Sequence, residues 1–301
     1  MRGVSFDELV ELSRRAIVGP PPEKMSEDAI EALNRLQKAD RPTEEQVAAL
    51  EYAIRLFRPA PLVKDTTVAP LPSESAAAFP GWDEFGAKVK PFLRSIGRVD
   101  RVTPDGRKVA IGTGFLIAPN LLVTNRHVVW QLSNGGDVVR SKEAVVYFRF
   151  DWDTDPEPPV AVRRVAAFDT KLDIAILEVE LAASDRTPLR LSTKPPHVGG
   201  TVVVVGFPWD DGRTPAFAQL LFGGRYGVKR AAPGEVLGCR TTSFLHDCTT
   251  LAANSGSPVL SMETAEVVGI HADGIYLYRN EAIMAISADE FLQHAVQNKG
   301  D

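Results

Sequence analysis

Three stretches of the sequence hold the residue types that acyl transfer requires. His127 stands in "TNRHVV", Asp173 in "KLDIAIL" and Ser255 in "ANSGSPV". A serine hydroxyl is a poor nucleophile at neutral pH, so it needs an imidazole that removes its proton. The imidazole in turn needs a carboxylate that holds its tautomer and stabilises the imidazolium. The three residues therefore predict a nucleophilic triad, provided that the fold brings them together.

Each of these residues also has an ordinary structural explanation when it is taken alone. A histidine at a strand end is often only hydrogen-bonded, an aspartate that opens a strand often forms a turn, and Asn-Ser-Gly-Ser-Pro suits any loop. Asp169 in "FDTKLD" is a second candidate for the carboxylate. The chemical interpretation is favoured by the ordered set of blocks with their flanking residues, not by any single residue.

The flanking residues extend these blocks to "GTGFLIAPNLLVTNRHVV", "DIAIL" and "NSGSPV", the last followed by "VVGIH". In all three blocks the region from about 90 to 298 resembles the trypsin-like serine peptidase superfamily. It is most similar to the bacterial branch that includes the glutamyl endopeptidases. Three ordered blocks are a more specific signal than one motif. The resemblance implies two six-stranded antiparallel β-barrels with the site in the cleft between them.

The resemblance also implies a role for each residue of the triad. His127 and Asp173 would come from the first barrel and Ser255 from the second. His127 would act as general base and later as general acid, with Asp173 as its orienting partner and Ser255 as the nucleophile. The family's acid directly precedes an apolar strand, as Asp173 precedes "IAIL", so Asp169 is expected to form a turn. No metal and no other cofactor is expected.

The oxyanion hole of the resembled family consists of two backbone amides, which correspond here to Ala253 and Ser255. Loss of one such donor typically costs about 2.7–4 kcal/mol of barrier. The family usually has glycine where Ala253 stands, and a positive φ there would strain alanine by about 1–2 kcal/mol. We therefore expect a slower or conditionally formed hole. Asn254 replaces an aspartate that digestive members pair with a new N-terminal amine, so no such maturation is expected.

The resemblance places the specificity pocket at Thr249, Thr250 and His271. Thr249 stands six residues before the nucleophile, where an aspartate would attract Lys or Arg, so trypsin-type specificity is not expected. Thr250 and His271 match the hydroxyl and imidazole with which glutamyl endopeptidases bind a glutamate carboxylate. This match predicts cleavage after Glu. The alternative for His271 is a hydrogen-bonded core histidine on an apolar strand.

The segment after His271 is expected to bind the substrate backbone. As the resembled fold implies, the backbone of Ala272 to Gly274 would pair with an extended substrate as an added strand. Asp273 lies within this segment and would weaken the attraction for an acidic substrate. The preference for Glu and the acidic side chain therefore act in opposite directions.

The elements that must position these residues are mainly short β-branched segments separated by Gly, Asn, Asp and Pro. Examples are "AVVYFRF", "TVVVVGF" and "EVVGIHA". This texture is typical of antiparallel barrels or a sandwich. A capping box from Ser287 to Glu290 predicts a helix near the C-terminus, because its side chains satisfy the free backbone donors of a first turn.

The first sixty residues have a different pattern. Capping boxes at Ser5–Glu8 and Thr43–Gln46, together with apolar stripes at helical spacing, predict three helices. The stripes consist of Phe6, Leu9, Val10 and Ile17; of Ile30, Leu33 and Leu36; and of Val47, Leu50, Ile54 and Phe57. Prolines and small residues then indicate an extended connector. We predict a helical module over 1–60 for recruitment or regulation, a Pro-rich linker over 61–88 and a peptidase domain over 89–301.

Charge and hydropathy exclude several partners. The net charge is -5, from 34 basic and 39 acidic residues spread along the chain, so no nucleic-acid footprint and no polybasic membrane patch is indicated. The N-terminus lacks the apolar region of a secretory signal, and no apolar run approaches the roughly 18 residues that span a bilayer. We expect a cytoplasmic protein that binds a protein or peptide substrate, with a further protein partner at the N-terminal helices.

Only two cysteines occur, Cys239 and Cys248. Two cysteines make no disulfide framework and fit free thiols in a reducing cytoplasm, although a single bridge is an alternative. Cys239, His246 and Cys248 are metal-ligand types, but their spacing is not that of a zinc site.

The leading hypothesis is thus a serine endopeptidase that works in regulated intracellular proteolysis. The alternative is a weak or inactive protease-fold module that binds peptides or partner proteins, because Ala253 prevents a working hole. An esterase of the α/β-hydrolase type is disfavoured, because the sequence lacks the G-x-S-x-G elbow and has the chain order His, Asp, Ser.

Overall fold

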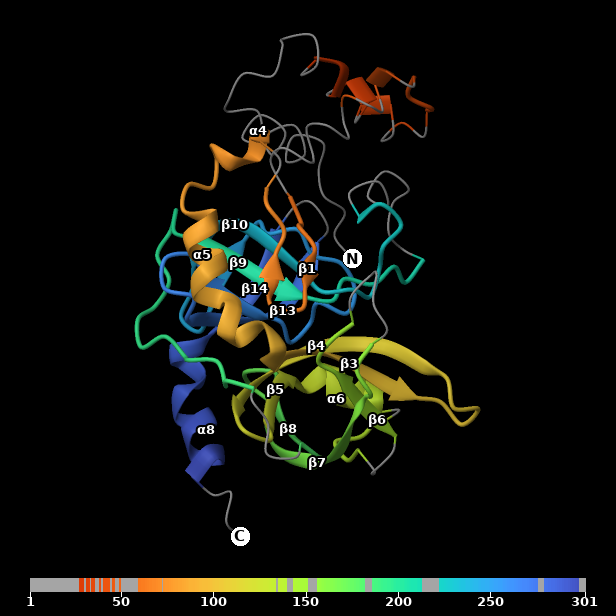
Figure 1. Cartoon of the computed structure of the whole chain (residues 1–301), viewed down its shortest axis with the longest axis vertical. Coiled ribbons are helices and arrows are strands. Elements are labelled where there is room, and N and C mark those ends of the chain that lie inside the picture. Colours follow the sequence, from red (N-terminus) through yellow and green to blue (C-terminus); the bar gives the residue numbers. More distant parts are fainter. Residues whose placement is uncertain are drawn as a thin grey trace.

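The computed structural model describes most of the chain from residue 59 onward. The described ranges are 59–71, 73–133, 135–139, 143–150, 156–181, 186–212, 222–275 and 279–297, preceded by 27–29, 31–32, 34–35, 38, 40–43, 45–46 and 49. Two closed barrels, each with six antiparallel strands, form the body of the molecule (Figure 1). The predicted pair of barrels is therefore confirmed, and the alternative of a sandwich is excluded.

The first barrel has the strand order β3-β4-β5-β8-β7-β6. Its strands are β3 (Ile96–Val102), β4 (Lys108–Ala118), β5 (Leu121–Asn125), β6 (Ala144–Tyr147), β7 (Val160–Asp169) and β8 (Ile174–Val179). Figure 1 shows this barrel in yellow and green. The run "IAILEV" of β8 is buried at all but one position. Ile174 and Ile176 pack into the cluster that joins the barrels, and the alternate residues Ala175, Leu177 and Val179 pack into a second apolar cluster of the first barrel.

The second barrel has the strand order β10-β11-β14-β13-β12-β9. Its strands are β9 (Thr201–Gly206), β10 (Arg230–Cys239), β11 (Ser243–His246), β12 (Pro258–Ser261), β13 (Val267–Ile275) and β14 (Arg279–Met284). A single apolar cluster joins the two barrels, with Phe115 and Ile176 from the first and Val203 and Leu260 from the second. The barrels therefore pack through a shared core, which fixes the geometry of any cleft between them.

The C-terminal helix α8 (Ala285–Gln297) is confirmed, and in Figure 1 it runs from the second barrel along the side of the first. It begins directly after β14, so Ser287 lies inside the helix. The capping box expected at Ser287–Glu290 is therefore not the helix start. Ala288 and Leu292 are buried against the barrels, and this apolar face decides where the helix lies.

The segment expected to be an extended linker, 61–88, instead folds onto the barrels. It contains β1 (Val63–Lys64), β2 (Thr67–Val68), α4 (Ser73–Ala76) and α5 (Trp82–Val89), and the turn η1 (Lys90–Ser95) leads from it into β3. Val63 N donates to Lys229 O of the second barrel at 2.9 Å. Trp82 and Phe85 are buried in the core that joins the barrels. The prolines prevent long helices here, but the apolar residues between them are still buried against the barrels.

Most of the predicted helical module over 1–60 lies outside the described residues, and so do the capping box at Ser5–Glu8 and Phe6, Leu9, Val10, Ile17, Ile30, Leu33, Leu36, Val47, Leu50, Ile54 and Phe57. The module as a unit stays a prediction. At the second capping box, Thr43 N donates to Gln46 Oε1 at 3.0 Å, and Gln46 N donates to Thr43 Oγ1 at 3.3 Å. This reciprocal pair is the arrangement that the sequence predicts.

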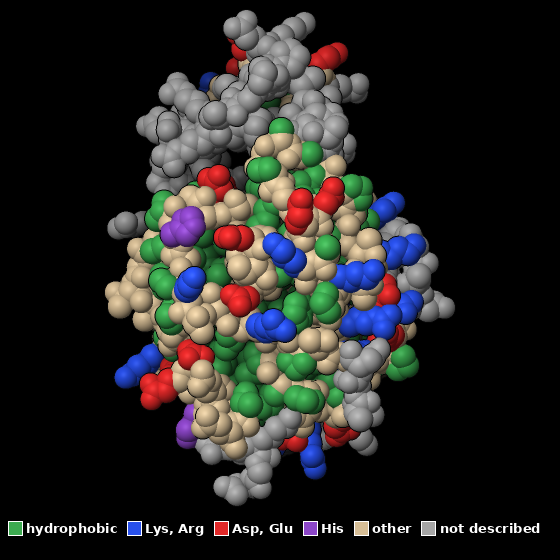
Figure 2. Space-filling model, turned by 60° about the vertical axis from the view of Figure 1, so that its left-hand side comes forward, with side chains coloured by type: hydrophobic (Ala, Val, Ile, Leu, Met, Phe, Trp, Pro, Cys, Tyr) green, Lys and Arg blue, Asp and Glu red, His purple; other side chains and the backbone are tan. Residues whose placement is uncertain are grey.

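The surface view in Figure 2 shows acidic and basic side chains over the same face of the barrels. In the part of the chain that the structure describes, no helix is both long and apolar enough to cross a membrane.

Candidate active site

The histidine of the predicted triad stands where β5 ends and α6 (Arg126–Leu132) begins. His127 lies in the first turn of α6, and its N–H donates to Asp173 Oδ1 at 2.9 Å. Its ring nitrogen Nδ1 lies 2.6 Å from Asp173 Oδ2. Asp173 thus holds both the backbone and the ring of the histidine, which leaves Nε2 as the ring nitrogen available for proton transfer.

Asp173 reaches His127 from the turn that precedes β8. Its φ is +54°, a left-handed conformation that aspartate tolerates better than most residues. Asn125 Nδ2 and Arg126 N both donate to Asp173 O at 3.1 Å. Asp169 has a different environment, since its Oδ1 accepts hydrogen bonds from Lys171 N at 2.7 Å and Leu172 N at 3.0 Å. Asp169 therefore forms the turn, and Asp173 contacts the histidine.

The nucleophile candidate stands in the loop that leads into β12. Ser255 lines a cavity of about 490 Å³ together with His127, Asp173 and Ala253. Gly256 has a φ of +86°, and a Cβ there would lie 2.1 Å from the carbonyl oxygen of a residue in β4. Only glycine fits this position. The fold thus brings the two predicted halves of the site to one cavity.

The Ser255 hydroxyl is hydrogen-bonded to a backbone carbonyl group. Its Oγ donates to Ala272 O at 3.4 Å, which is a long hydrogen bond. Within the described part of the chain, Ser255 Oγ makes no hydrogen bond to His127. Catalytic hydrogen bonds are often long or misaligned without substrate and shorten in the complex.

The backbone of Ala253 lies in the left-handed region. Ala253 has a φ of +62°, so the positive φ anticipated at this alanine is present, with its strain of about 1–2 kcal/mol. Among the described residues, no protein acceptor receives a hydrogen bond from the amide of Ala253 or of Ser255. The two N–H groups expected to bind an oxyanion are therefore available to a ligand.

Asn254 lies between these two amides and is 2% exposed. Its Nδ2 donates to Leu251 O at 3.4 Å, and its Oδ1 accepts from Ser257 Oγ at 3.5 Å. Both contacts are with neutral groups of the same loop. Because the buried side chain carries no charge, no cation has to be inserted beside it.

The residues expected at the base of the specificity pocket are buried and lie outside this cavity. Thr249, Thr250 and His271 are buried, and none of them lines the cavity that contains Ser255. Thr250 Oγ1 donates to Asn280 Oδ1 at 2.7 Å. Asn280 Nδ2 donates to Cys248 O at 2.6 Å, so the threonine hydroxyl belongs to a buried network.

His271 lies next to a second buried histidine, His246. His271 Nδ1 lies 3.3 Å from His246 Nε2, and both side chains are buried. Burial lowers the pKa of His271 to about 3, and the nearby His127 acts in the same direction. His271 is therefore a neutral imidazole at physiological pH, and it can offer a carboxylate a hydrogen bond but not a positive charge.

The rim of the cavity is acidic. Asp211 and Asp273 line it beside Trp209 and Ala272, and neither Lys nor Arg is found among its described lining residues. Gly274, which was also expected to contact substrate, is exposed and does not line this cavity.

The comparison with known families decides the classification. The sequence profile of the "Trypsin-like peptidase domain" matches residues 112–270, which is more than half of the chain. The chain belongs to the trypsin-like peptidase family. The matched range runs from β4 to β13, so it includes parts of both barrels, and it contains His127, Asp173 and Ser255.

Two curated relatives of this trypsin-like peptidase are serine proteases of Mycobacterium tuberculosis, MT3772 and Rv3671c. Each is 27% identical over 181 residues, a match that covers 58% of this chain and 39% of the relative. The chain thus spans well under half the length of these relatives.

Among solved structures, the active form of the Rv3671c protease from M. tuberculosis has a TM-score of 0.50 and 20% identity, and covers 74% of this chain and 86% of its own. The serine endoprotease from Yersinia pestis has a TM-score of 0.52 and 16% identity, with 71% and 67% covered. At these identities the likeness shows the fold.

The two cysteines of this trypsin-like peptidase are free thiols, so the alternative of a disulfide bridge is excluded. Cys239 is exposed and Cys248 is buried. The described residues contain no group of three or more His, Cys, Asp or Glu side chains that could hold a metal ion.

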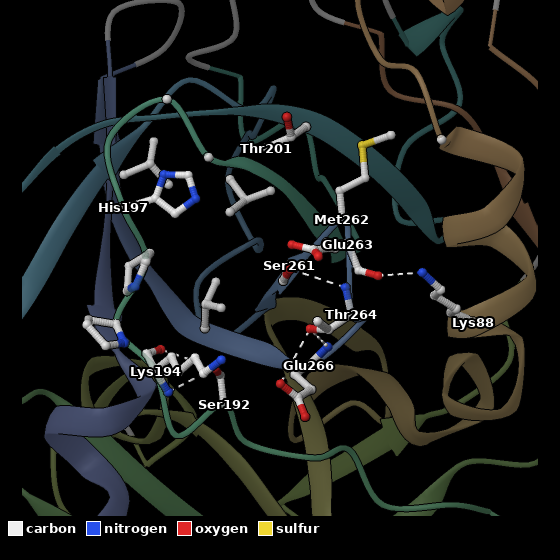
Figure 3. Close-up of a pocket in the computed structure, with 18 of the residues that line it drawn as sticks. Lys88, Ser192, Lys194, His197, Thr201, Ser261, Met262, Glu263, Thr264 and Glu266 are labelled. Carbon is white, nitrogen blue, oxygen red and sulfur yellow. Dashed lines mark hydrogen bonds between the residues drawn. The ribbon is translucent and has the colours of Figure 1, made fainter.

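A second cavity, of about 870 Å³, lies between α5 and the second barrel. Lys88 lies on one side of it and His197 on the other (Figure 3). Lys88 Nζ donates to Glu263 O at 2.6 Å. None of His127, Asp173 and Ser255 lines this cavity, and its walls carry both acidic and basic side chains. The candidate chemistry therefore belongs to the smaller cavity.

Proposed function

We propose that this protein is a serine endopeptidase that hydrolyses peptide bonds through Ser255, His127 and Asp173. The observation that carries the proposal is the shared cavity in which the tightly bonded His127–Asp173 pair faces the serine and two available amides. The membership of the trypsin-like peptidase family supports the same reaction.

In the proposed reaction, the Ser255 hydroxyl rotates from Ala272 O toward His127 Nε2 and attacks the scissile carbonyl carbon. His127 takes the hydroxyl proton, and Asp173 stabilises the imidazolium through Nδ1. The developing oxyanion accepts hydrogen bonds from the amides of Ala253 and Ser255. The imidazolium then gives its proton to the leaving amine, and water hydrolyses the acyl-enzyme by the reverse sequence of proton transfers.

The substrate binds as an added strand in this proposal. Strand β12 pairs with β13 only as far as Ile270, whereas β13 continues to Ile275. The edge of β13 from Ala272 onward therefore has backbone groups that β12 does not pair. An extended peptide that uses this edge passes Ser255, because the Ser255 hydroxyl already contacts Ala272 O.

A preference for Glu before the scissile bond is the finer part of the proposal. In this proposal, Thr250 and His271 supply the hydroxyl and the imidazole that would donate hydrogen bonds to a carboxylate. In the structure both groups already have buried partners, since Thr250 Oγ1 donates to Asn280 Oδ1 and His271 Nδ1 lies 3.3 Å from His246 Nε2. The neutral state of His271 and the acidic rim formed by Asp211 and Asp273 both act against an acidic side chain. We therefore expect a modest preference for Glu over Gln rather than a strict specificity.

The cellular role also belongs to the proposal. Regulated proteolysis inside the cell, with residues 1–60 as a recruiting or regulatory segment, is an interpretation by architecture rather than by a site. After this segment, Val63, Trp82 and Phe85 are buried in the core that joins the barrels.

The decisive test is labelling with a fluorophosphonate, which forms a stable covalent bond only with an activated serine. We expect labelling of the wild type and none of Ser255→Ala, with His127→Ala labelled much more slowly. Ser257→Ala is the matched control, because Ser257 stands in the same loop and is fully buried. Equal absence of labelling in wild type and Ser255→Ala would contradict the proposal and favour a peptide-binding module with an inactive hole.

The pocket is tested separately with peptides that differ only in Glu, Gln or Lys before the scissile bond. We expect kcat/KM for Glu to exceed that for Gln by a few-fold, and the difference to disappear in His271→Gln. An unchanged Glu-to-Gln ratio in the variant would remove His271 from the pocket without affecting the proposed triad.

A further inference from the structure

We propose that Arg98 and Thr113, which face each other on the neighbouring strands β3 and β4 of the first barrel, are positioning residues for the oxyanion hole of the second barrel. The inference rests on the proposed function, since it concerns the same site. Ala253 holds a φ of +62°, which an alanine does not prefer, so neighbouring groups must hold it there. The peptide groups on both sides of Ala253 are held from these two strands.

Thr113 holds the peptide group that follows Ala253. Its side chain is fully buried, and Oγ1 donates to Ala253 O at 2.8 Å and accepts from Phe207 N at 3.2 Å. The Thr113 N–H also donates to Ser255 O at 2.8 Å. One residue of the first barrel therefore fixes the carbonyl groups of both residues whose amides form the proposed hole.

Trp209 holds the peptide group that precedes Ala253. Trp209 N donates to Ala252 O at 2.8 Å, and the two residues form an isolated antiparallel bridge. The C=O and N–H of a trans peptide point in opposite directions, so this bond directs the Ala253 N–H away from Trp209. Rotation of the Ala252–Ala253 peptide would break the bond and withdraw the Ala253 amide as a donor.

Arg98 holds the loop that carries Trp209. Its guanidinium makes a bidentate ion pair with Asp100, at 2.8 and 2.7 Å, and both side chains are buried. Its third donor, Nη1, reaches Gly227 O of the second barrel at 2.8 Å, and the guanidinium lies 6.0 Å from the Trp209 ring. Gly227 N in turn donates to Pro208 O at 2.7 Å, next to Trp209. Asp100 fixes the direction of Arg98, and Arg98 fixes this loop.

The Thr113 contact is tested with Thr113→Val, which keeps the shape of the side chain and removes the hydroxyl, and Thr113→Ser, which keeps the hydroxyl. We expect Thr113→Val to lower kcat about 10- to 100-fold with little change in KM, because the hole binds the transition state more strongly than the substrate. Thr113→Ser should stay within about threefold of the wild type. Equal kcat in the two variants would overturn the role of the hydroxyl.

The Arg98 and Trp209 contacts are tested with a pair of glycines in one loop. Gly227 and Gly224 have φ values of +68° and +67°, so alanine is strained equally at both. A Cβ at Gly227 would lie 2.7 Å from the Trp209 ring and 2.9 Å from Arg98 Nη1, whereas Gly224 has nothing within 4 Å. We expect Gly227→Ala to lower kcat by about 10²-fold at unchanged KM, and Gly224→Ala to leave both constants close to the wild type.

Two results separate this inference from the proposed function. If wild-type protein is labelled at Ser255 by the fluorophosphonate and Gly227→Ala and Gly224→Ala are labelled at the same rate, the inference is overturned and the proposed function stands. If the wild type is not labelled at all, the proposed function and this inference are both overturned. Slower labelling of Gly227→Ala and Thr113→Val, with melting temperatures that match their control variants, supports the positioning role.

Discussion

In the first barrel, His127 and Asp173 contact each other directly, through the ring at 2.6 Å and through the backbone at 2.9 Å. In the second barrel, the Ser255 hydroxyl has a long hydrogen bond to Ala272 O, and within the described ranges the Ala253 amide has no protein acceptor. The acid–base half of the site is thus assembled by its own side chains. The nucleophile half is assembled by the conformation of a loop.

The two halves of the site differ in how far they depend on contacts with the rest of the protein. The His127–Asp173 pair lies within one barrel and is fixed by short local contacts. The loop of Ser255 has positive φ values at Ala253 and Gly256, and Thr113 of the other barrel holds the carbonyl groups of Ala253 and Ser255. A change at the interface between the barrels should therefore reach the nucleophile half before it reaches the acid–base half.

The largest effect is expected from breaking the acid–base half. Asp173→Asn keeps the shape of the side chain but favours the wrong tautomer of His127, and kcat should fall by about 10⁴-fold with KM little changed. Asp169→Asn is the matched control, because Asp169 stands four residues earlier and its oxygen only accepts turn hydrogen bonds that an amide can also accept. Steady-state kinetics on one peptide substrate measures both. A similar loss in the two variants would contradict the assignment of Asp173.

The next largest effect is expected from acid, which should lower the stability of the folded protein through the buried His271 of the second barrel. Burial holds the pKa of His271 at about 3, whereas the ordinary value is 6.5. Between these values the unfolded chain binds more protons than the folded chain. The contribution of His271 to the free energy of unfolding is therefore fully present above pH 6.5. It is lost as the pH falls toward 3, by up to about 1.4 kcal/mol per pH unit.

Urea unfolding at pH 7.5 and pH 5 measures this linkage. The wild type should lose about 2 kcal/mol more stability between these two pH values than His271→Gln. The difference between the two proteins at pH 7.5 reports lost packing and serves as the internal reference. The same pH dependence in both proteins would contradict the pKa of His271.

The fold could be predicted, and the three candidate residues of the site could be selected, because their sequence signals are contiguous. The blocks around His127, Asp173 and Ser255 each combine a reactive side chain with a strand or turn whose residues are adjacent in the sequence. The φ of Ala253 could also be anticipated, since its position in the loop determines it. A contiguous block carries its own local geometry.

The parts that could not be predicted depend on contacts between distant residues. Thr113 and Arg98 are separated from Ala253 by about half of the chain, and in the sequence they are ordinary polar residues of a strand. The pairing of His271 with His246 likewise depends on the strand order β11-β14-β13. The prolines of the segment 61–88 predict a linker, whereas the buried Trp82 and Phe85 of this segment belong to no periodic pattern.

The smallest effect is expected from relieving the strained alanine. Ala253→Gly removes the Cβ at a φ of +62°, which should raise the free energy of unfolding by about 0.5–1 kcal/mol after the higher entropy of glycine in the unfolded chain is subtracted. Ala265→Gly is the matched control, because Ala265 is a buried alanine with a φ of +58° that lines neither the cavity nor its rim. Thermal unfolding should show the same gain for both variants.

Activity should distinguish the two alanines. If Ala253 forms the oxyanion hole, relief of its strain favours the competent conformation, and kcat should rise by up to about fivefold in Ala253→Gly and stay unchanged in Ala265→Gly. Thr113→Val should also cost less in the Ala253→Gly background, because glycine adopts the positive φ without help from the first barrel. Additive effects of Thr113→Val and Ala253→Gly would mean that the hydroxyl does not act through Ala253. The nucleophile half would then not depend on the first barrel in the way that its hydrogen bonds indicate.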